Sequence, residues 1–159
     1  MLRLCLSFAI ISLALSHLCL ISPHQRSTMA GVNAAGANDC LRLKEDCGGE
    51  APVTPTQGFL AGSKQNFTFQ KNLNHYNAKA PGFFSLGIGM AGEMKFEPLI
   101  KNIPDTNSSS LSLYTVEVML PKKPMAHAVI QVVYMTNNPN APKAFYQCAD
   151  IATVETQKL

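Results

Sequence analysis

The chain has 159 residues, of which 47% are hydrophobic and only 14% are charged, and its formal net charge is +3. This composition is too apolar for a disordered chain and too poor in Lys, Glu and Arg for a coiled coil, and the length fits one globular domain. No basic cluster exceeds the pair Lys122-Lys123, so nucleic-acid or anionic-membrane binding has no electrostatic basis.

The first 16 residues have the pattern of a secretory signal peptide. Arg3 precedes an apolar run over residues 4–13, and small residues occupy the −3 and −1 positions before His17. We therefore expect residues 1–16 to be a signal peptide and residues 17–159 to be a single domain. An alternative cleavage after Ala30 requires an apolar segment interrupted by charged and proline residues, so it is disfavoured.

The predicted localisation is secreted and extracellular. The apolar stretch of the leader is too short for a transmembrane anchor, and residues 154–159 offer no hydrophobic tail for a lipid anchor. Two acceptor sequons, at Asn66 and Asn107, predict N-glycosylation and agree with secretion.

Four cysteines remain once Cys5 leaves with the leader. An even number in an oxidising compartment predicts two disulfides, and sequence alone leaves three pairings open. A bridge between Cys47 and Cys148 would pin the last strand to the early loop region. The alternative, a four-thiolate zinc site, lacks a C-x2-C pair. The four residues are Cys19, Cys40, Cys47 and Cys148.

In chain order, a loop-rich segment precedes a series of strands. Residues 27–55 are rich in Gly, Ala, Asn and Pro and show no periodicity apart from one helical turn around 39–46. Later runs alternate apolar and polar residues between Pro, Gly and Asn turns. The pattern predicts an all-β, immunoglobulin/fibronectin-like antiparallel β-sandwich with a long disulfide-tied N-terminal loop region. The expected strands are 66–70, 82–88, 111–120, 126–134 and 145–154.

The histidines are the most informative polar residues, because hydrolase and nucleotide-binding motifs are absent from the sequence. As a new amino terminus, His17 would offer its α-amine and its imidazole Nδ1 as a chelate, and a second imidazole would complete a nitrogen set that suits Cu(II). His75, in the loop after the 66–70 strand, is the candidate second imidazole. Taken alone, a loop histidine is more often solvated or bonded to backbone.

Several segments resemble lytic polysaccharide monooxygenases. Residues 17–26, HLCLISPHQR, are similar to the H-x(5)-P-x-x-R opening of that family, and Cys47-Gly48-Gly49 resembles its CGG loop. The passage from Phe67 through His75 to Pro81-Gly82 is similar to the one that supplies the second histidine of the copper site. Residues 145–151, FYQCADI, resemble the closing F-Y-x-x-x-D-[IV] strand.

The resemblance implies a copper cofactor held in a histidine brace. His17 would bind through its amine and Nδ1, His75 would bind through Nε2, and Phe145 would shield the axial position. Asp150 and Tyr146 are alternative axial residues. Because Asp150 follows Phe145 by five positions, the two point to opposite faces of a regular strand, and only one can reach the metal.

Residues 146–151, YQCADI, also resemble the Y-Q-C-A-D-[LI] closing strand of the short fungal copper-acquisition factors. The absence of Trp and the small number of Tyr residues, four, disfavour stacking on a crystalline glycan. The main hypothesis is therefore a secreted protein that binds one copper ion in extracellular copper handling, with a copper transporter as a candidate partner. The alternatives are a small copper-dependent monooxygenase acting on chitin or another polysaccharide, and a metal-free secreted recognition module.

Other residues have weaker claims on the metal. His127, at the start of the 126–134 strand, is expected to be a hydrogen-bonded strand residue, and His24 is expected to lie at the surface or beside the site. Arg26 is expected to anchor the N-terminal segment through a carboxylate. The methionines are expected mainly to fill the core.

Overall fold

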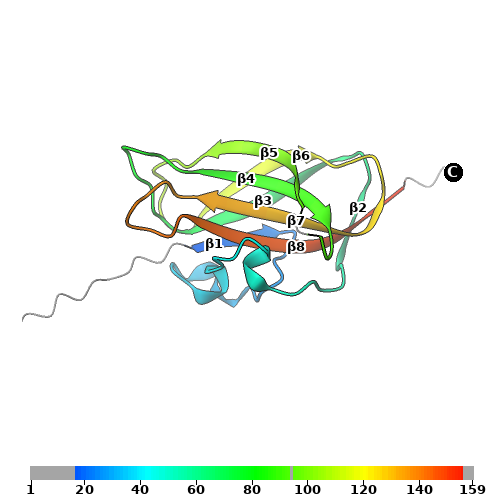
Figure 1. The fold of residues 1–159 in the computed structure, drawn as a ribbon, viewed down its shortest axis with the longest axis horizontal. Coiled ribbons are helices and arrows are strands. Elements are labelled where there is room, and N and C mark those ends of the chain that lie inside the picture. Colours follow the sequence, from blue (N-terminus) through cyan, green and yellow to red (C-terminus); the bar gives the residue numbers. More distant parts are fainter. Residues whose placement is uncertain (1–16, 94, 156–159) are drawn as a thin grey trace, which may run out of the picture.

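The computed structural model describes residues 17–93 and 95–155, so the predicted signal peptide, residues 1–16, lies outside the described residues. Within these residues, eight strands and three short 3-10 segments follow one another, and the strands are labelled in Figure 1. The strands are β1 (His17–Ser22), β2 (Gln57–Leu60), β3 (Lys64–Leu73), β4 (Phe83–Met90), β5 (Glu97–Pro104), β6 (Ser112–Met119), β7 (Met125–Met135) and β8 (Ala144–Val154). The 3-10 segments are η1 (Ala30–Asn33), η2 (Asn38–Cys40) and η3 (Cys47–Gly49).

The strands form two facing sheets, which confirms the predicted all-β sandwich. One sheet has the order β1-β3-β6 and the other β2-β8-β7-β4-β5. All pairs are antiparallel except β2 with β8, which is parallel. The five predicted strands correspond to β3, β4, β6, β7 and β8, whereas β1, β2 and β5 were not predicted.

The three additional strands carry weak alternation signals. The residues of β1 from His17 to Leu20 are buried on both faces of the strand, so apolar and polar residues do not alternate there. Only four residues form β2, one of them Gly58, and β5 is an edge strand that contains Pro98 and Pro104. Short or proline-containing edge strands lack the regular alternation on which the prediction depends.

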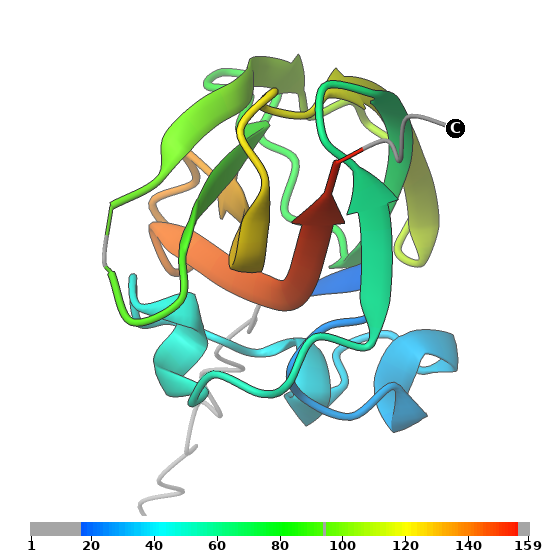
Figure 2. The same ribbon diagram turned by 90° about the vertical axis from the view of Figure 1, so that its right-hand side faces the viewer.

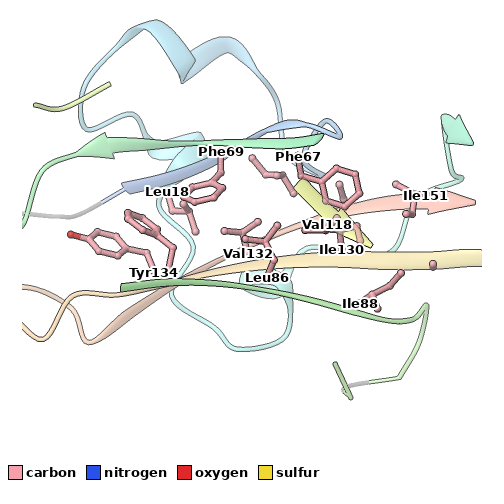
Figure 3. Packing of buried hydrophobic residues seen from close by; sticks show 14 of the residues in the cluster. Leu18, Phe67, Phe69, Leu86, Ile88, Val118, Ile130, Val132, Tyr134 and Ile151 are labelled. Carbon is pink, nitrogen blue, oxygen red and sulfur yellow. The ribbon is translucent and has the colours of Figure 1, made fainter. Parts of the chain in front are cut away.

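The core lies between the sheets and contains a cluster of aromatic rings. Phe67 and Phe69 of β3 point toward Ile130 and Tyr134 of β7 (Figure 3). The ring centroids of Phe69 and Phe84 are 4.9 Å apart, and those of Phe84 and Tyr134 are 4.4 Å apart. Each such buried ring contributes roughly 1.5–3 kcal/mol to the free energy of folding.

The segment between β1 and β2 lies along one side of the sandwich, next to β1 and β8 (Figure 2). It contains only the three 3-10 segments, so the loop-rich prediction is confirmed, although the turns fall at 38–40 and 47–49 and not across 39–46. Two disulfides attach it to the sheets: Cys19–Cys40 to β1 and Cys47–Cys148 to β8. No helix within the described residues is long and apolar enough to cross a membrane.

Candidate metal centre

Strand pairing brings the two candidate histidines to the same end of the sandwich. His17 opens β1 and lies opposite Leu73, the last residue of β3, while His75 follows two positions later. Opposed Cα atoms in antiparallel strands are about 5 Å apart and a strand advances about 3.3 Å per residue, so the Cα atoms of His17 and His75 lie within roughly 12 Å. Both residues are buried, at 2% and 6% exposure.

A loop covers the imidazole of His17. A side chain added at Gly36 would begin 3.9 Å from Cε1 of His17 and from Cδ2 of Leu73. The loop is held there by the buried Asn72, whose Oδ1 accepts hydrogen bonds from the main-chain N–H groups of Gly36 (2.8 Å) and Ala37 (3.1 Å). Strand β3 therefore leads into the loop of His75 and also, through Asn72, holds the loop that covers His17.

The residues at this position fit copper by the chemistry of their donors. Two neighbouring buried imidazoles provide the nitrogen ligands that Cu(II) prefers, and a free amine at His17 would add a third. Within 17–93 and 95–155 there is no group of three or more His, Cys, Asp or Glu side chains arranged to hold a metal. A histidine brace does not need such a group, because it has only two ligand side chains.

Phe145, the predicted axial residue, lies in the core on the inner face of β8. It is fully buried at the start of β8 and pairs with Tyr134 of β7, whose ring centroid is 6.2 Å away. Phe145 therefore belongs to the aromatic cluster of the core.

The alternative axial residues point elsewhere. Strand β8 pairs with β7 without a register shift over Ala144–Ile151, so Asp150 lies on the opposite face from Phe145, as the alternation predicts, and roughly 16 Å further along at about 3.3 Å per residue. Tyr146 also faces the loop region, where burial and the neighbouring Glu45 raise its pKa. Of the three axial candidates, Phe145 faces the core between the sheets, whereas Asp150 and Tyr146 face the loop region.

Asp150 instead forms the centre of a separate polar group. Its carboxylate accepts hydrogen bonds from Arg26 Nε (2.6 Å) and Nη2 (2.9 Å), and it lies 2.7 Å from Nε2 of His127. Burial opposes ionisation of Asp150, but these hydrogen bonds outweigh burial and lower its pKa below the ordinary value. The expected roles of Arg26 as an anchor and of His127 as a hydrogen-bonded strand residue are confirmed, and His24 is exposed.

The sequence analysis missed a buried charged pair between β3 and the residue that follows β5. Nζ of Lys71 lies 2.9 Å from Oδ1 of Asp105, both side chains are fully buried, and the Tyr134 hydroxyl donates to Oδ2 of Asp105 at 2.6 Å. Burial and the bond to Asp105 raise the pKa of Tyr134. The period-two alternation of β3 places Lys71 on the same face as Phe69, and this is the signal that could have revealed an inward-facing lysine.

Comparison with solved structures shows that the chain has the fold of lytic polysaccharide monooxygenases. It is similar to an AA15 enzyme of this class from Thermobia domestica in the Cu(I) state, with 17% identity and a TM-score of 0.56 over 88% of this chain and 100% of that one. The catalytic domain of a Listeria monocytogenes enzyme has 16% identity and a TM-score of 0.56, over 87% and 100% of the two chains.

A Cellvibrio japonicus enzyme of the same class, important for efficient utilisation of chitin, has 12% identity and a TM-score of 0.51, over 85% of this chain and 98% of that one. No protein-family model matches the sequence, and no curated protein matches it. The resemblance inferred from the sequence motifs is thus confirmed at the level of the fold.

Proposed function

We propose that the chain is secreted by cleavage before His17 and binds one copper ion in extracellular copper handling. His17 would bind through its α-amine and Nδ1 and His75 through Nε2, with Phe145 shielding the axial side. The observation that carries the proposal is the register of β1 on β3, which sets His17 opposite Leu73 and beside the loop of His75 in a fold shared with copper proteins. Bound copper would supply one-electron Cu(II)/Cu(I) chemistry.

The residues around the histidines would determine how the site treats its ion. The buried rings of Phe145 and Tyr134 pack together in the core, and the Gly36 loop covers the imidazole of His17. The pair of Arg26 and Asp150 fixes the chain shortly after β1 and so limits the movement of the amino-terminal strand. A rigid, covered pair of imidazoles favours tight retention of a metal ion over rapid exchange.

The surroundings support copper handling more than oxidation of a crystalline glycan. Every Phe and Tyr within the described residues is buried or half-buried, which leaves no fully exposed ring for stacking on sugars. The loop between β7 and β8, which contacts His75, carries Asn137, Asn138 and Asn140 in place of aromatic residues. The likeness of residues 146–151 to the fungal copper-acquisition factors supports the same assignment.

The second candidate is a copper-dependent monooxygenase acting on chitin or another polysaccharide. It is favoured by the fold, because the similar structures are lytic polysaccharide monooxygenases and one is described as important for chitin utilisation. Amide side chains near the site could hydrogen-bond a glycan without stacking. If the chain handles copper, a copper transporter would receive the ion from it. If the chain is a monooxygenase, a polysaccharide would be its partner.

The test begins with the mass of the amino-terminal peptide of the secreted protein, followed by titration with Cu(II). We expect a chain that starts at His17 and binds one equivalent, with the affinity lost by at least 100-fold in His75→Ala and retained in the control His24→Ala, which alters an exposed histidine. Copper bound without oxidised oligosaccharides in the presence of reductant supports copper handling. Oxidised products would establish the monooxygenase, and no stoichiometric copper would leave a metal-free recognition module.

A further inference from the structure

Strand β6 lies at one edge of the three-stranded sheet and pairs only with β3 within the described residues (Figure 1). The N–H of Leu120, just beyond β6, donates to the carbonyl oxygen of Ser63 at 2.9 Å, and the register continues along the strand without a shift. Hydrogen-bonded pairs alternate in antiparallel strands, so the main-chain groups of residues 114, 116 and 118 face β3. The main-chain groups of residues 113, 115, 117 and 119 therefore face away from the sheet.

The other edge strands are protected against pairing with another chain. At β1, Gln25 occupies the outer main-chain groups of Leu20: its Oε1 accepts from the Leu20 N–H at 2.9 Å, and its N–H donates to the Leu20 carbonyl oxygen at 3.2 Å. Strand β5 contains Pro98 and Pro104, and Asn102 has a positive φ of 57°. Strand β2 has only four residues. Proline, irregular backbone and short length keep sheet edges from pairing, and the eight residues of β6 have none of these features.

The outward side chains of β6 are polar in the middle of the strand and apolar toward its two ends. The hydroxyl of Thr115 and the carboxylate of Glu117 contact polar side chains of β3. Leu113 and Met119 are 61% and 55% exposed. The middle of the strand is thus paired within the chain, whereas the two large apolar side chains are left in water.

We propose that β6 pairs antiparallel with β6 of a second copy of this chain. The pairing joins the two three-stranded sheets into one continuous sheet across a twofold axis, an isologous contact in which the same surface serves both copies. The unpaired main-chain groups of one copy then bind those of the other, as in the addition of a strand to an exposed sheet edge.

The side chains select one register for this pair. An axis at Val116 uses the whole strand and sets Leu113 opposite Met119 of the other copy. Thr115 then lies opposite Glu117. An axis at Glu117 would set two carboxylates against each other, and an axis at Thr115 would set Leu113 against Glu117. The axis at Val116 therefore gives compatible neighbours at all four outward positions, with roughly eight main-chain hydrogen bonds, two for each opposed pair.

The test is sedimentation equilibrium of the secreted protein over a range of concentrations, without added copper. We expect a wild-type dimer with a dissociation constant in the micromolar range, because the interface is a single pair of strands. Leu113→Lys should raise this constant about tenfold, since it sets an ammonium against Met119 twice in each dimer. Leu43→Lys is the matched control: it adds the same charge at a leucine that is 47% exposed in the segment between β1 and β2, and it should change the constant by less than about twofold.

An exchange of charges tests the register itself. Leu113→Lys combined with Met119→Glu places opposite charges in each opposed pair, so it should return the dissociation constant to within about threefold of wild type. The two positions are roughly 20 Å apart along one strand, at about 3.3 Å per residue, so these charges meet only between copies. A double variant that dimerises as weakly as Leu113→Lys would overturn the proposed register.

Hydrogen exchange adds a measurement that needs no variant. The amides of residues 113, 115, 117 and 119 should exchange about tenfold more slowly at a protein concentration well above the dissociation constant than at one well below it. The amides of residues 114, 116 and 118 are bonded to β3 in both states and should not change. A wild type that stays monomeric at every concentration, or exchange at the four outward amides that is independent of concentration, would overturn the proposal. Because no copper is added, these outcomes are separate from those that test the proposed function.

Discussion

Replacing Lys71 by methionine isolates the energetic contribution of the buried charged pair. Both side chains of the Lys71–Asp105 pair are fully buried, and the carboxylate of Asp105 would keep only its bond from Tyr134 after the substitution. Removing one partner of a buried ion pair leaves an uncompensated charge and costs about 3–5 kcal/mol, a large share of the 5–15 kcal/mol typical of a folded domain. We therefore expect Lys71→Met to lower the free energy of unfolding by about 4 kcal/mol.

The assay is urea unfolding at pH 7 with the free energy extrapolated to water. Lys64→Met is the matched control: it changes the same residue type on the same strand, but the side chain of Lys64 is 62% exposed in its pair with Glu117. Exposed pairs are screened by solvent, so the control should show no measurable change. A loss below about 1 kcal/mol for Lys71→Met would show that the pair is not a specific stabilising element and would refute the reasoning.

Further predictions concern the pH dependence of Cu(II) binding, acid unfolding and the two disulfides. Cu(II) affinity should fall as pH falls below about 8, because the α-amine of His17 must lose its proton to bind, and titrations at pH 6 and 8 measure the difference. The pKa of Asp150 is lower in the folded protein than its unfolded value of 3.8, so its carboxylate stabilises the fold fully above that value. This stabilisation is lost as the pH falls through the folded pKa. In acid unfolding, the free energy of unfolding should therefore fall more with pH in wild type than in Asp150→Asn. Removal of the Cys47–Cys148 bridge, which spans 101 residues, should cost more in thermal stability than removal of Cys19–Cys40, which spans 21, by about 1–2 kcal/mol in the loop-entropy account.

Each of these has an outcome that would contradict it. Affinity for Cu(II) that is constant from pH 6 to 8 would argue against amine ligation by His17. Identical acid unfolding of wild type and Asp150→Asn would show that the pairs of Asp150 with Arg26 and His127 do not stabilise the fold. Equal losses from the two bridge deletions would indicate that loop length does not govern their stabilisation.

Local patterns in the sequence were sufficient for the sheet class and for much of the strand content. Alternation marked β3, β4, β6, β7 and β8, because a strand with one buried face repeats every two residues. The same rule separated Phe145 from Asp150 on opposite faces of β8. The even count of cysteines predicted two disulfides but left the pairing open.

Only the tertiary structure decided which distant residues meet. The pairing of β1 with β3 sets His17 beside the loop of His75, and no local pattern marks β1 as a strand. The partners Lys71 and Asp105 are 34 positions apart and come from different sheets or their ends, so their pairing depends on how the two sheets pack. The reason is physical: periodicity reports the burial of one residue relative to its neighbours in sequence, whereas the candidate metal centre and its support are made by contacts between segments far apart along the chain.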